Sequence, residues 1–309
     1  MDENLSLEEL LEALLELAHP LEPFDMPLLD AHGATLADDL YVGEEVVLPM
    51  GSPIRAAQVG FAASLGLHHL PTRPHPRVVV ISAGDDLVQP GESLLNGDHQ
   101  FETNSWMLAV AMKEAGATAF RVHAIPENAE MLRSVIEDQL VRSDLIVITG
   151  ERGDQSFDLI TAVLQGLGNI RTAQPALVDS GRYNFGTIGP DNTPVITLPG
   201  DPVSAYLGAE LFLRPMVRTM LGSRDLFRPR VKATVKEKVQ SPRGKRSFIR
   251  VRIEGLEGNG KGKSYTAIPL PNQESLASLS IAHGLMLVGE EVEELPTGTT
   301  VDVLLFSKQ

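Results

Sequence analysis

Arg77-Val78-Val79-Val80-Ile81-Ser82 is the stretch on which the fold of this chain depends. Its aliphatic run is typical of a β-strand covered on both faces, and it ends in Gly84-Asp85-Asp86. Outward from it, strand-like and helix-like segments alternate: strands are expected at 119–125, 145–149 and 194–198, and helices at 104–116, 128–141, 157–167 and 203–221. This alternation predicts an α/β fold, a doubly wound and mostly parallel sheet with helices on both faces.

Two regions of different pattern flank this segment. Before it, Ser6 to Leu17 carries leucines at helical spacing behind a capping box, residues 28–36 suggest a second short helix, and residues 40–48 suggest a strand. After it, short alternating segments up to residue 306 predict an all-β, barrel-like domain. We therefore expect three units, at 1–76, 77–222 and 223–309.

Composition narrows the classes of function. The 309 residues include 41 acidic and 26 basic side chains, and the net charge of −15 disfavours nucleic acid and anionic lipid as partners. The absence of cysteine excludes disulfides, a thiolate nucleophile and zinc–thiolate sites. The first residues lack a basic signal region, and no apolar run reaches the roughly 20 residues that cross a bilayer. We expect a cytoplasmic protein without a membrane segment.

Glycine-containing turns follow three of the expected strands: 82–86, 149–154 and 198–202. In an open α/β sheet the ligand lies outside the carboxyl ends of the strands, where backbone N–H groups and helix N-termini bind phosphate. The architecture therefore favours a phosphorylated ligand. Carboxylates crowd the same turns, however, and such carboxylates either bind a cation or repel an anion.

These motifs resemble those of the MoeA/gephyrin family of molybdopterin molybdenumtransferases. Residues 82–87 are similar to its S-T-G-D-E-L turn, 97–104 to its G-x-I-x-D-[ST]-N segment, and 198–205 to L-P-G-N-P-V-S-A. The resemblance implies a homodimer with a MogA-like sheet domain, an N-terminal dimerisation region and a C-terminal β domain like MoeA domain IV. It also implies molybdopterin or adenylylated molybdopterin as ligand, with Mg²⁺, for the insertion of molybdate.

The resemblance carries site residues onto this chain. Asp86 and Asp158 are the catalytic candidates, and the cofactor-binding candidates are Gly84, Asp85, Thr149, Gly150, Arg182, Pro199, Gly200, Pro202 and Ser204. Plainer interpretations stay open, because Gly200 and Pro202 also suit an ordinary strand-to-helix turn. Asp85 and Asp86 also suit solvated or helix-capping positions. The sequence does not show whether the acidic strand ends hold a metal ion.

Three departures from the family pattern stand beside these matches. Glu151 replaces a glycine of S-G-G-V-S, and Val178-Asp179-Ser180-Gly181-Arg182 falls on K-P-G-K-P, so that both lysines are lost. The family's lasso and inserted β domain have no counterpart between Leu36 and Ile54. Because one lost donor in such a site costs about 3–4 kcal/mol of transition-state stabilisation, these changes predict a degraded molybdenum-insertion site.

A degraded site favours a second role, binding another protein. Gephyrin, which this chain resembles, is a scaffold that receives a peptide between its N-terminal helix and its C-terminal β domain. The matching candidates here are Leu11, Leu14, Leu287, Val288, Leu295 and Pro296. The resemblance suggests a cytoskeletal protein or a membrane-receptor tail as partner, although a leucine-rich helix also suits ordinary dimer core. The sequence thus favours a scaffold, with a working molybdenumtransferase as the alternative.

Overall fold

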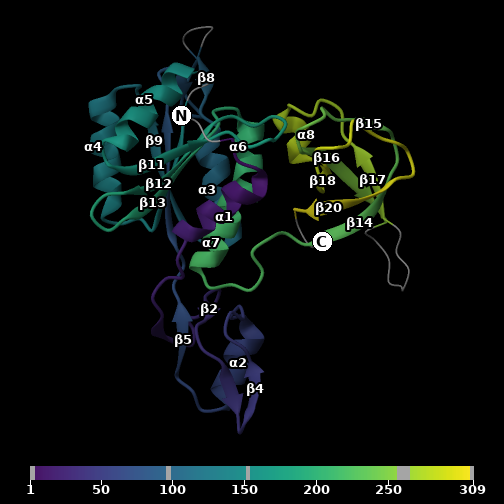
Figure 1. The fold of residues 1–309 in the computed structure, drawn as a ribbon. Helices are drawn as coiled ribbons and strands as arrows, with labels where there is room; N and C mark the ends of the chain where they lie inside the picture. Colours follow the sequence, from purple (N-terminus) through teal and green to yellow (C-terminus); the bar gives the residue numbers. More distant parts are fainter. Residues whose placement is uncertain (1–3, 95–98, 151–153, 256–264, 307–309) are drawn as a thin grey trace.

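The computed structural model describes residues 4–94, 99–150, 154–255 and 265–306, and its ribbon has three parts (Figure 1). A layered α/β part and a small β-barrel lie side by side, and a stalk built from residues 24–73 projects from the α/β part. Within the described ranges, the helices fall short of the length and apolar character that crossing a membrane requires.

The central sheet has six strands in the order β11-β12-β13-β10-β6-β9. The parallel strands are β6 (Arg77–Ala83), β9 (Thr118–Ile125), β10 (Leu145–Thr149) and β13 (Thr193–Leu198). β12 (Tyr183–Ile188) runs antiparallel to β13, and β11 (Gly168–Ala173) pairs antiparallel with β12. The mostly parallel α/β sheet is confirmed. The β11–β12 hairpin was not predicted, because Asn, Thr and Gly interrupt its apolar pattern.

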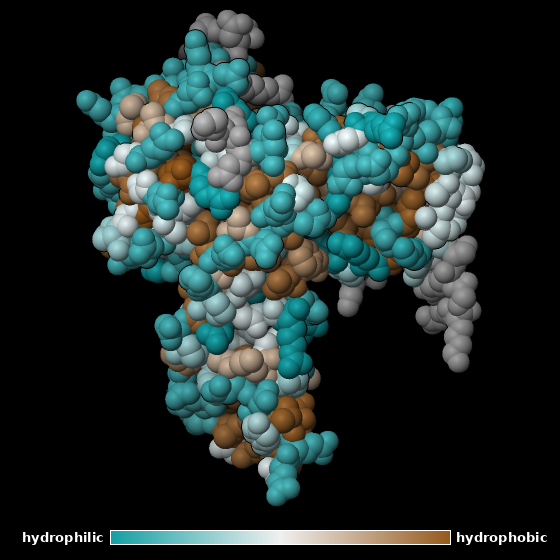
Figure 2. Space-filling model, in the orientation of Figure 1, coloured by the Kyte–Doolittle hydropathy of each residue, from teal (hydrophilic) through white to brown (hydrophobic). Residues whose placement is uncertain are grey.

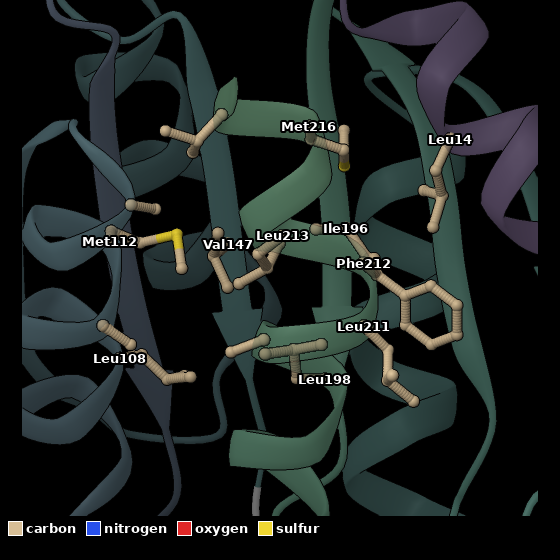
Figure 3. Close-up of a cluster of buried hydrophobic side chains, with 14 of the residues drawn as sticks. Leu14, Leu108, Met112, Val147, Ile196, Leu198, Leu211, Phe212, Leu213 and Met216 are labelled. Carbon is tan, nitrogen blue, oxygen red and sulfur yellow. The ribbon is translucent and has the colours of Figure 1, made fainter. Parts of the chain in front are cut away.

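Successive residues of each parallel strand face opposite helical layers. One layer holds α3 (Asn104–Ala115) and the helices after β13, and it buries Val78, Val80, Val147 and Ile196 (Figure 3). The other layer holds α4 (Ala129–Leu140) and α5 (Asp154–Gln165), and it buries Val79, Ile81, Ile146, Ile148 and Val195. Helices on both faces of the sheet are therefore confirmed, and continuous apolar strands follow from burial on both sides.

The long helix predicted at 203–221 is present but interrupted by one π turn. It comprises α6 (Pro202–Gly208), η1 (Ala209–Leu213) and α7 (Arg214–Met220). Pro215 has no N–H to donate to the preceding turn, which favours a local change of helix type there. Within η1, Glu210 is buried and accepts two hydrogen bonds of 2.8 Å from Arg228, which also bonds the carbonyl of Phe306 at the end of the barrel.

The N-terminal helix α1 (Leu7–Leu17) has the predicted capping box: Ser6 Oγ accepts from the Glu9 N–H at 3.2 Å, and the Glu9 carboxylate accepts from the Ser6 N–H at 2.7 Å. Its buried face, Leu10 and Leu14, packs in the cluster of α3 and α7 (Figure 3). The helix is therefore part of the α/β core and does not share a core with the stalk.

The stalk has its own small core. It contains β1 (Phe24–Pro27), β2 (Thr35–Leu36) and β5 (His69–Arg73) in the order β1-β5-β2, the hairpin of β3 (Leu40–Val42) and β4 (Glu45–Leu48), and α2 (Ala56–Ser64). The short helix predicted at 28–36 is wrong: turns and β2 occupy this stretch, and the N–H of Gly33, at φ +85°, donates to Ile54.

The C-terminal part is a closed barrel in the order β14-β17-β16-β18-β20, which confirms the predicted β domain. Its strands are β14 (Arg230–Val235), β16 (Ser247–Glu254), β17 (Tyr265–Pro269), β18 (Gly284–Val288) and β20 (Thr300–Leu305). Smaller elements are the strand pairs β15 (Val239–Gln240) with β19 (Glu294–Leu295) and β7 (Leu87–Val88) with β8 (Gln100–Phe101), and helix α8 (Leu276–Ser280).

Leu14→Ala should destabilise the protein far more than Leu29→Ala. Leu14 is fully buried between α1 and the α/β core, so its truncation should lower the free energy of unfolding by about 2–5 kcal/mol. Leu29 is 86% exposed, and its truncation should change stability by less than about 0.5 kcal/mol. Urea unfolding of both variants measures the difference. Equal, small effects would show that α1 is not part of the core.

Candidate functional site

Three loops meet where β6, β10 and β13 end. In the register of the sheet Thr149 lies opposite both Ser82 and Leu198, so the three strands end at the same level. A cavity of about 350 Å³ opens there between the β10 and β13 loops and the loop before β12. Of the predicted ligand-binding residues, Gly150, Arg182, Pro199, Gly200 and Ser204 line it.

A pocket of about 40 Å³ adjoins this cavity and shares Gly150 and Gly200 with it. Its lining adds Pro202, also a predicted residue, together with Ser82 and Asn104. Asn104 lies in the resemblance segment 97–104, of which residues 97 and 98 fall outside the described residues. Its amide donates a 2.8 Å hydrogen bond to the carbonyl of Gly200, so this segment holds the β13 turn in place.

The end of β6 does not contribute its predicted residues to either cavity. Gly84, Asp85 and Asp86 line neither of them. The Asp85 carboxylate accepts a 2.9 Å hydrogen bond from the backbone N–H of Glu127, and the carbonyl of Asp86 accepts one of 3.0 Å from Gln100. The structure therefore places Asp85, an exposed residue, in a loop-fastening position, which is not the helix-capping position that the sequence suggested as one alternative.

At the end of β10, Thr149 is fully buried and lies 3.3 Å from Ser82 through their hydroxyls. Gly150 cannot be replaced without movement, because a Cβ there would lie 2.7 Å from the Ser156 hydroxyl and 2.8 Å from the Ile160 side chain. Glu151, the predicted departure from the family, lies outside the described residues, as do 152 and 153.

The β13 turn is an ordinary helix start as well as a cavity wall. Asp201 caps α6: its carboxylate accepts from the Ser204 N–H at 2.9 Å and from the Ser204 hydroxyl at 2.8 Å. Pro202 occupies the first turn, where a missing N–H costs nothing. Gly200 and Pro202 therefore belong to an ordinary strand-to-helix turn and also line the cavities at the strand ends.

Arg182 is the cation at the mouth of the cavity. Its guanidinium lies 2.8 Å from the carboxylate of Asp154 and 3.5 Å from that of Asp158, and it stacks on the ring of Phe157 at 4.1 Å. The side chain of Asp158 is 70% exposed, and its carboxylate forms this ion pair with Arg182. Neither of the two predicted catalytic residues, Asp86 and Asp158, lines the cavity or the adjoining pocket.

The first residue of β12, Tyr183, carries a buried hydroxyl. Burial raises the pKa of Tyr183 to about 12, so its phenol stays protonated at neutral pH. Its oxygen lies 3.3 Å from the hydroxyl of Ser180 in the cavity wall. Tyr183 therefore fixes the loop through a neutral hydrogen bond and adds no charge to the site.

A residue that sequence reasoning missed lies next to this cavity. Arg250 of β16 is 2% exposed, and its guanidinium lies 4.0 Å from the carboxylate of Asp179. The sequence pattern of β16 does not identify it, because Val251 and Ile253 alternate with Arg250 and belong to the barrel core, whereas Arg250 lies near Asp179 of the α/β part. Leu177 and Arg246 form the backbone bridge that brings these two parts together.

The carboxylates near the cavity do not make a metal site by themselves. Among the described residues there is no group of three or more His, Cys, Asp or Glu side chains arranged to hold a metal ion. Asp154 and Asp158 share Arg182, and Asp201 is used as a helix cap. The described residues thus form no metal site of their own, and a Mg²⁺ ion, which usually takes one or two carboxylates with phosphate oxygens and water, would need the phosphate of a bound ligand there.

A second, more apolar groove lies between α1 and the barrel. Its volume is about 430 Å³, and Leu7, Leu11, Phe248, Leu285, Leu287 and Phe306 are among its lining residues. Leu11 and Leu287, two of the predicted partner-binding residues, thus line this groove. The structure does not bring the other candidates there: Leu14 lies in the α/β core, Val288 and Leu295 lie in the barrel core, and Pro296 is exposed elsewhere.

Comparison with known proteins agrees with this division of the chain. Residues 79–219 match the family model of a probable molybdopterin binding domain, and residues 232–306 match that of the MoeA C-terminal region, domain IV. The fold and the two matches define a protein with a molybdopterin-binding-type α/β domain followed by a MoeA-type β domain.

Relatives that match along most of this chain narrow the class of protein further. Molybdopterin molybdenumtransferase 1 of Mycobacterium tuberculosis is 30% identical over 273 residues, 88% of this chain and 64% of that protein. Molybdopterin molybdenumtransferase 2 of the same organism is 32% identical over 272 residues, 84% of this chain and 65% of that protein. The chain therefore spans less than two thirds of the length of these relatives. It belongs to the MoeA family.

Solved structures agree on the fold. A molybdopterin biosynthesis MoeA protein from Pyrococcus horikoshii superposes with a TM-score of 0.81 at 20% identity, over 99% of this chain and all of that one. A molybdenum cofactor biosynthesis protein from Pyrococcus furiosus gives a TM-score of 0.75 at 22% identity, over 98% of this chain and all of that one.

Proposed function

We propose that this chain is a molybdopterin molybdenumtransferase, which binds molybdopterin in the cavity at the ends of β10 and β13 and acts in molybdenum cofactor biosynthesis. The observation that carries the proposal is the 350 Å³ cavity itself, which Gly150, Gly200 and Arg182 line at the carboxyl edge of the sheet. The names of the relatives support the same activity. The adenylylated form of the ligand and Mg²⁺ belong to the proposal through the family resemblance alone.

Arg182 has the clearest chemical part in this proposal. Its guanidinium lines the cavity and stacks on the ring of Phe157, and two of its partners, Asp154 and Asp158, are exposed carboxylates that solvent screens well. A phosphate group offers the same planar guanidinium a stronger, bidentate partner. We therefore expect the ligand phosphate to replace Asp154 and Asp158 at Arg182. This exchange compensates in part for the lysines that the sequence lacks at 178–182.

Arg182→Gln should weaken the binding of molybdopterin by about tenfold to a hundredfold, because a hydrogen-bonded charge pair contributes about 1.5–3 kcal/mol. Arg133→Gln is the matched control, since Arg133 is half exposed in a surface pair with Glu137 on α4. Calorimetry of both variants and an assay of molybdenum insertion measure the two effects. If the unmodified protein binds no molybdopterin, the proposed activity is wrong.

A protein-binding role is the second candidate, because the groove of 430 Å³ combines an apolar floor with a charged rim. Arg246 lies in this rim, where it pairs with Glu8 of α1 and at 2.8 Å with Glu290. The sequence favoured this scaffold role over catalysis. The relatives and the open cavity at the strand ends support the enzyme more strongly, so the scaffold role is the second proposal. In that role the groove would bind a cytoskeletal protein or the tail of a membrane receptor.

Leu11→Glu should abolish capture of a groove-binding partner, because it places a carboxylate among the apolar side chains that line the groove. Leu29→Glu is the control, since Leu29 is 86% exposed on the stalk. Pull-downs with the two variants and the unmodified protein compare the bound proteins. Retention of every partner by Leu11→Glu would remove this role from the groove.

We also propose a homodimer through the outer face of α3 and the edge strand β9. Trp106, Val110 and Phe120 are 46–56% exposed there, and Arg121 stacks on the Trp106 ring at 3.6 Å. β9 ends the sheet, so its outer edge has no neighbouring strand in the described fold. The hairpin at the end of the stalk adds exposed Tyr41, Val42, Val46, Val47 and Met50, where hydrophobic surface is visible in Figure 2.

Val110→Glu should convert the dimer into a monomer, because it places a charge in the middle of this apolar face. Val141→Glu is the control: Val141 is 87% exposed beyond the end of α4, on the other helical layer. Sedimentation velocity at micromolar concentration distinguishes the two states. A dimer that survives Val110→Glu would place the interface elsewhere.

A further inference from the structure

Phe157 is an aromatic side chain in the wall of the main cavity, near the start of α5. It belongs to none of the hydrophobic clusters that the described residues form, whereas Leu159 and Ile160 of the same helix pack in the cluster of α4 and α5. Its ring instead lies against Arg182, with the guanidinium carbon 4.1 Å from the ring centre. Packing of the core therefore does not account for an aromatic residue at this position.

Arg182 is the cation of the cavity. Among the described residues that line it, Arg182 alone has a basic side chain, while Asp154, Asp179 and Asp201 are acidic. An anionic group in the cavity is therefore attracted at one place, and the position of this guanidinium decides how well the group is bound. An arginine side chain has many rotamers in water, so its contacts must fix it in the cavity wall.

Two kinds of described contact act on this guanidinium. Asp154 at 2.8 Å and Asp158 at 3.5 Å are 92% and 70% exposed, and exposed ion pairs favour one geometry by at most about fivefold. A guanidinium over an aromatic ring is favoured by about threefold to thirtyfold, with the larger values where water is excluded. Salt screens the exposed ion pairs, whereas the ring contacts the cation directly. The ring is therefore the stronger of the two kinds of contact.

The ring contact is also compatible with a bound ligand. The guanidinium donates to Asp154 while it stacks on Phe157, so the ring leaves N–H groups for acceptors. A phosphate that replaces the carboxylates at Arg182 takes these N–H groups and does not compete with the ring. The stack can therefore persist from the unliganded to the liganded state, whereas the two ion pairs cannot.

We propose that Phe157 is a positioning residue whose ring holds the guanidinium of Arg182 in the cavity wall, before and during the binding of an anionic group. This inference rests on the proposed function, because it specifies how the site keeps its cation in place when the ligand phosphate displaces the carboxylates. Phe157 acts through Arg182 and does not itself contact the ligand. The site therefore requires an aromatic ring at residue 157, which an aliphatic side chain of similar size does not replace.

A double-mutant cycle tests whether Phe157 acts through Arg182. Phe157→Leu should weaken the binding of molybdopterin by about threefold to thirtyfold, and Phe157→Tyr, which keeps the ring, should retain most of the affinity. In the Arg182→Gln background, Phe157→Leu should have no further effect, because the ring then has no cation to hold. Gln165→Leu, at an exposed position at the far end of α5, is the matched control. Calorimetry with molybdopterin and with inorganic phosphate measures these affinities.

A second readout needs no ligand. NMR relaxation of the Arg182 Nε–H group is measured in about 1 M sodium chloride, where the screening length falls to about 3 Å. The arginine side chain should stay ordered in the unmodified protein and in Phe157→Tyr, and it should become mobile in Phe157→Leu. A folded Phe157→Leu variant is expected, because leucine is a good helix former and Phe157 lies outside the core clusters of the described residues.

Each outcome decides the inference. Additive effects in the cycle overturn it, because the ring would then contact the ligand itself, and so does an Arg182 side chain that stays ordered in Phe157→Leu. Either result leaves the proposed function standing in a protein that binds molybdopterin. Phosphate affinities that follow the expected cycle, in a protein that binds no molybdopterin, support the inference and contradict the proposed function. Binding of neither probe overturns both.

Discussion

The register of β10 between β6 and β13 is the constraint on which the site depends. Thr149 pairs with Ser82 on one side and with Leu198 on the other, so three strands end level and their loops open at one edge. A shift of one residue would turn every side chain of β10 to the opposite helical layer. Because Val147 and Ile148 are buried in different layers, both layers oppose such a shift. The core that stabilises the fold therefore also sets the geometry of the cavity.

The barrel holds the loop before β12, which forms one wall of the cavity. Backbone hydrogen bonds of 2.9 Å join Arg246 to Ala176 and Val178, at the start of the loop that carries Asp179 and Arg182. The side chain of the same arginine pairs with Glu8 of α1. Arg228 makes a second connection, from Glu210 in the π turn to Phe306, just after the last strand of the barrel. These contacts hold the barrel against the α/β part, next to the loop that carries Asp179 and Arg182.

The sequence predicted the elements whose apolar pattern is local, and it failed where the pattern depends on distant partners. The run at 77–82 and the capping box at Ser6 are read correctly because burial on both faces and a helix cap leave signatures within a few residues. Residues 28–36 have helical spacing, but their apolar groups pack into the small stalk core as turns. Arg250 looks like a surface residue in the sequence, yet it is 2% exposed and lies 4.0 Å from Asp179, a residue of the α/β part that is distant in the chain.

The effect of the acidic side chains at the strand ends depends on what each carboxylate contacts. Counting acidic residues near the strand ends suggested a pocket that repels its ligand, yet the structure gives these carboxylates different tasks. Asp85 fastens a loop and Asp201 caps a helix, so each of these carboxylates has a structural task. Asp154 and Asp158 hold Arg182 at the cavity mouth. Asp179 also lines the main cavity, and its carboxylate lies 4.0 Å from the guanidinium of Arg250. The loss of two lysines therefore leaves a cavity in which Arg182 remains as a cation and most of the acidic side chains already have a partner or a structural task.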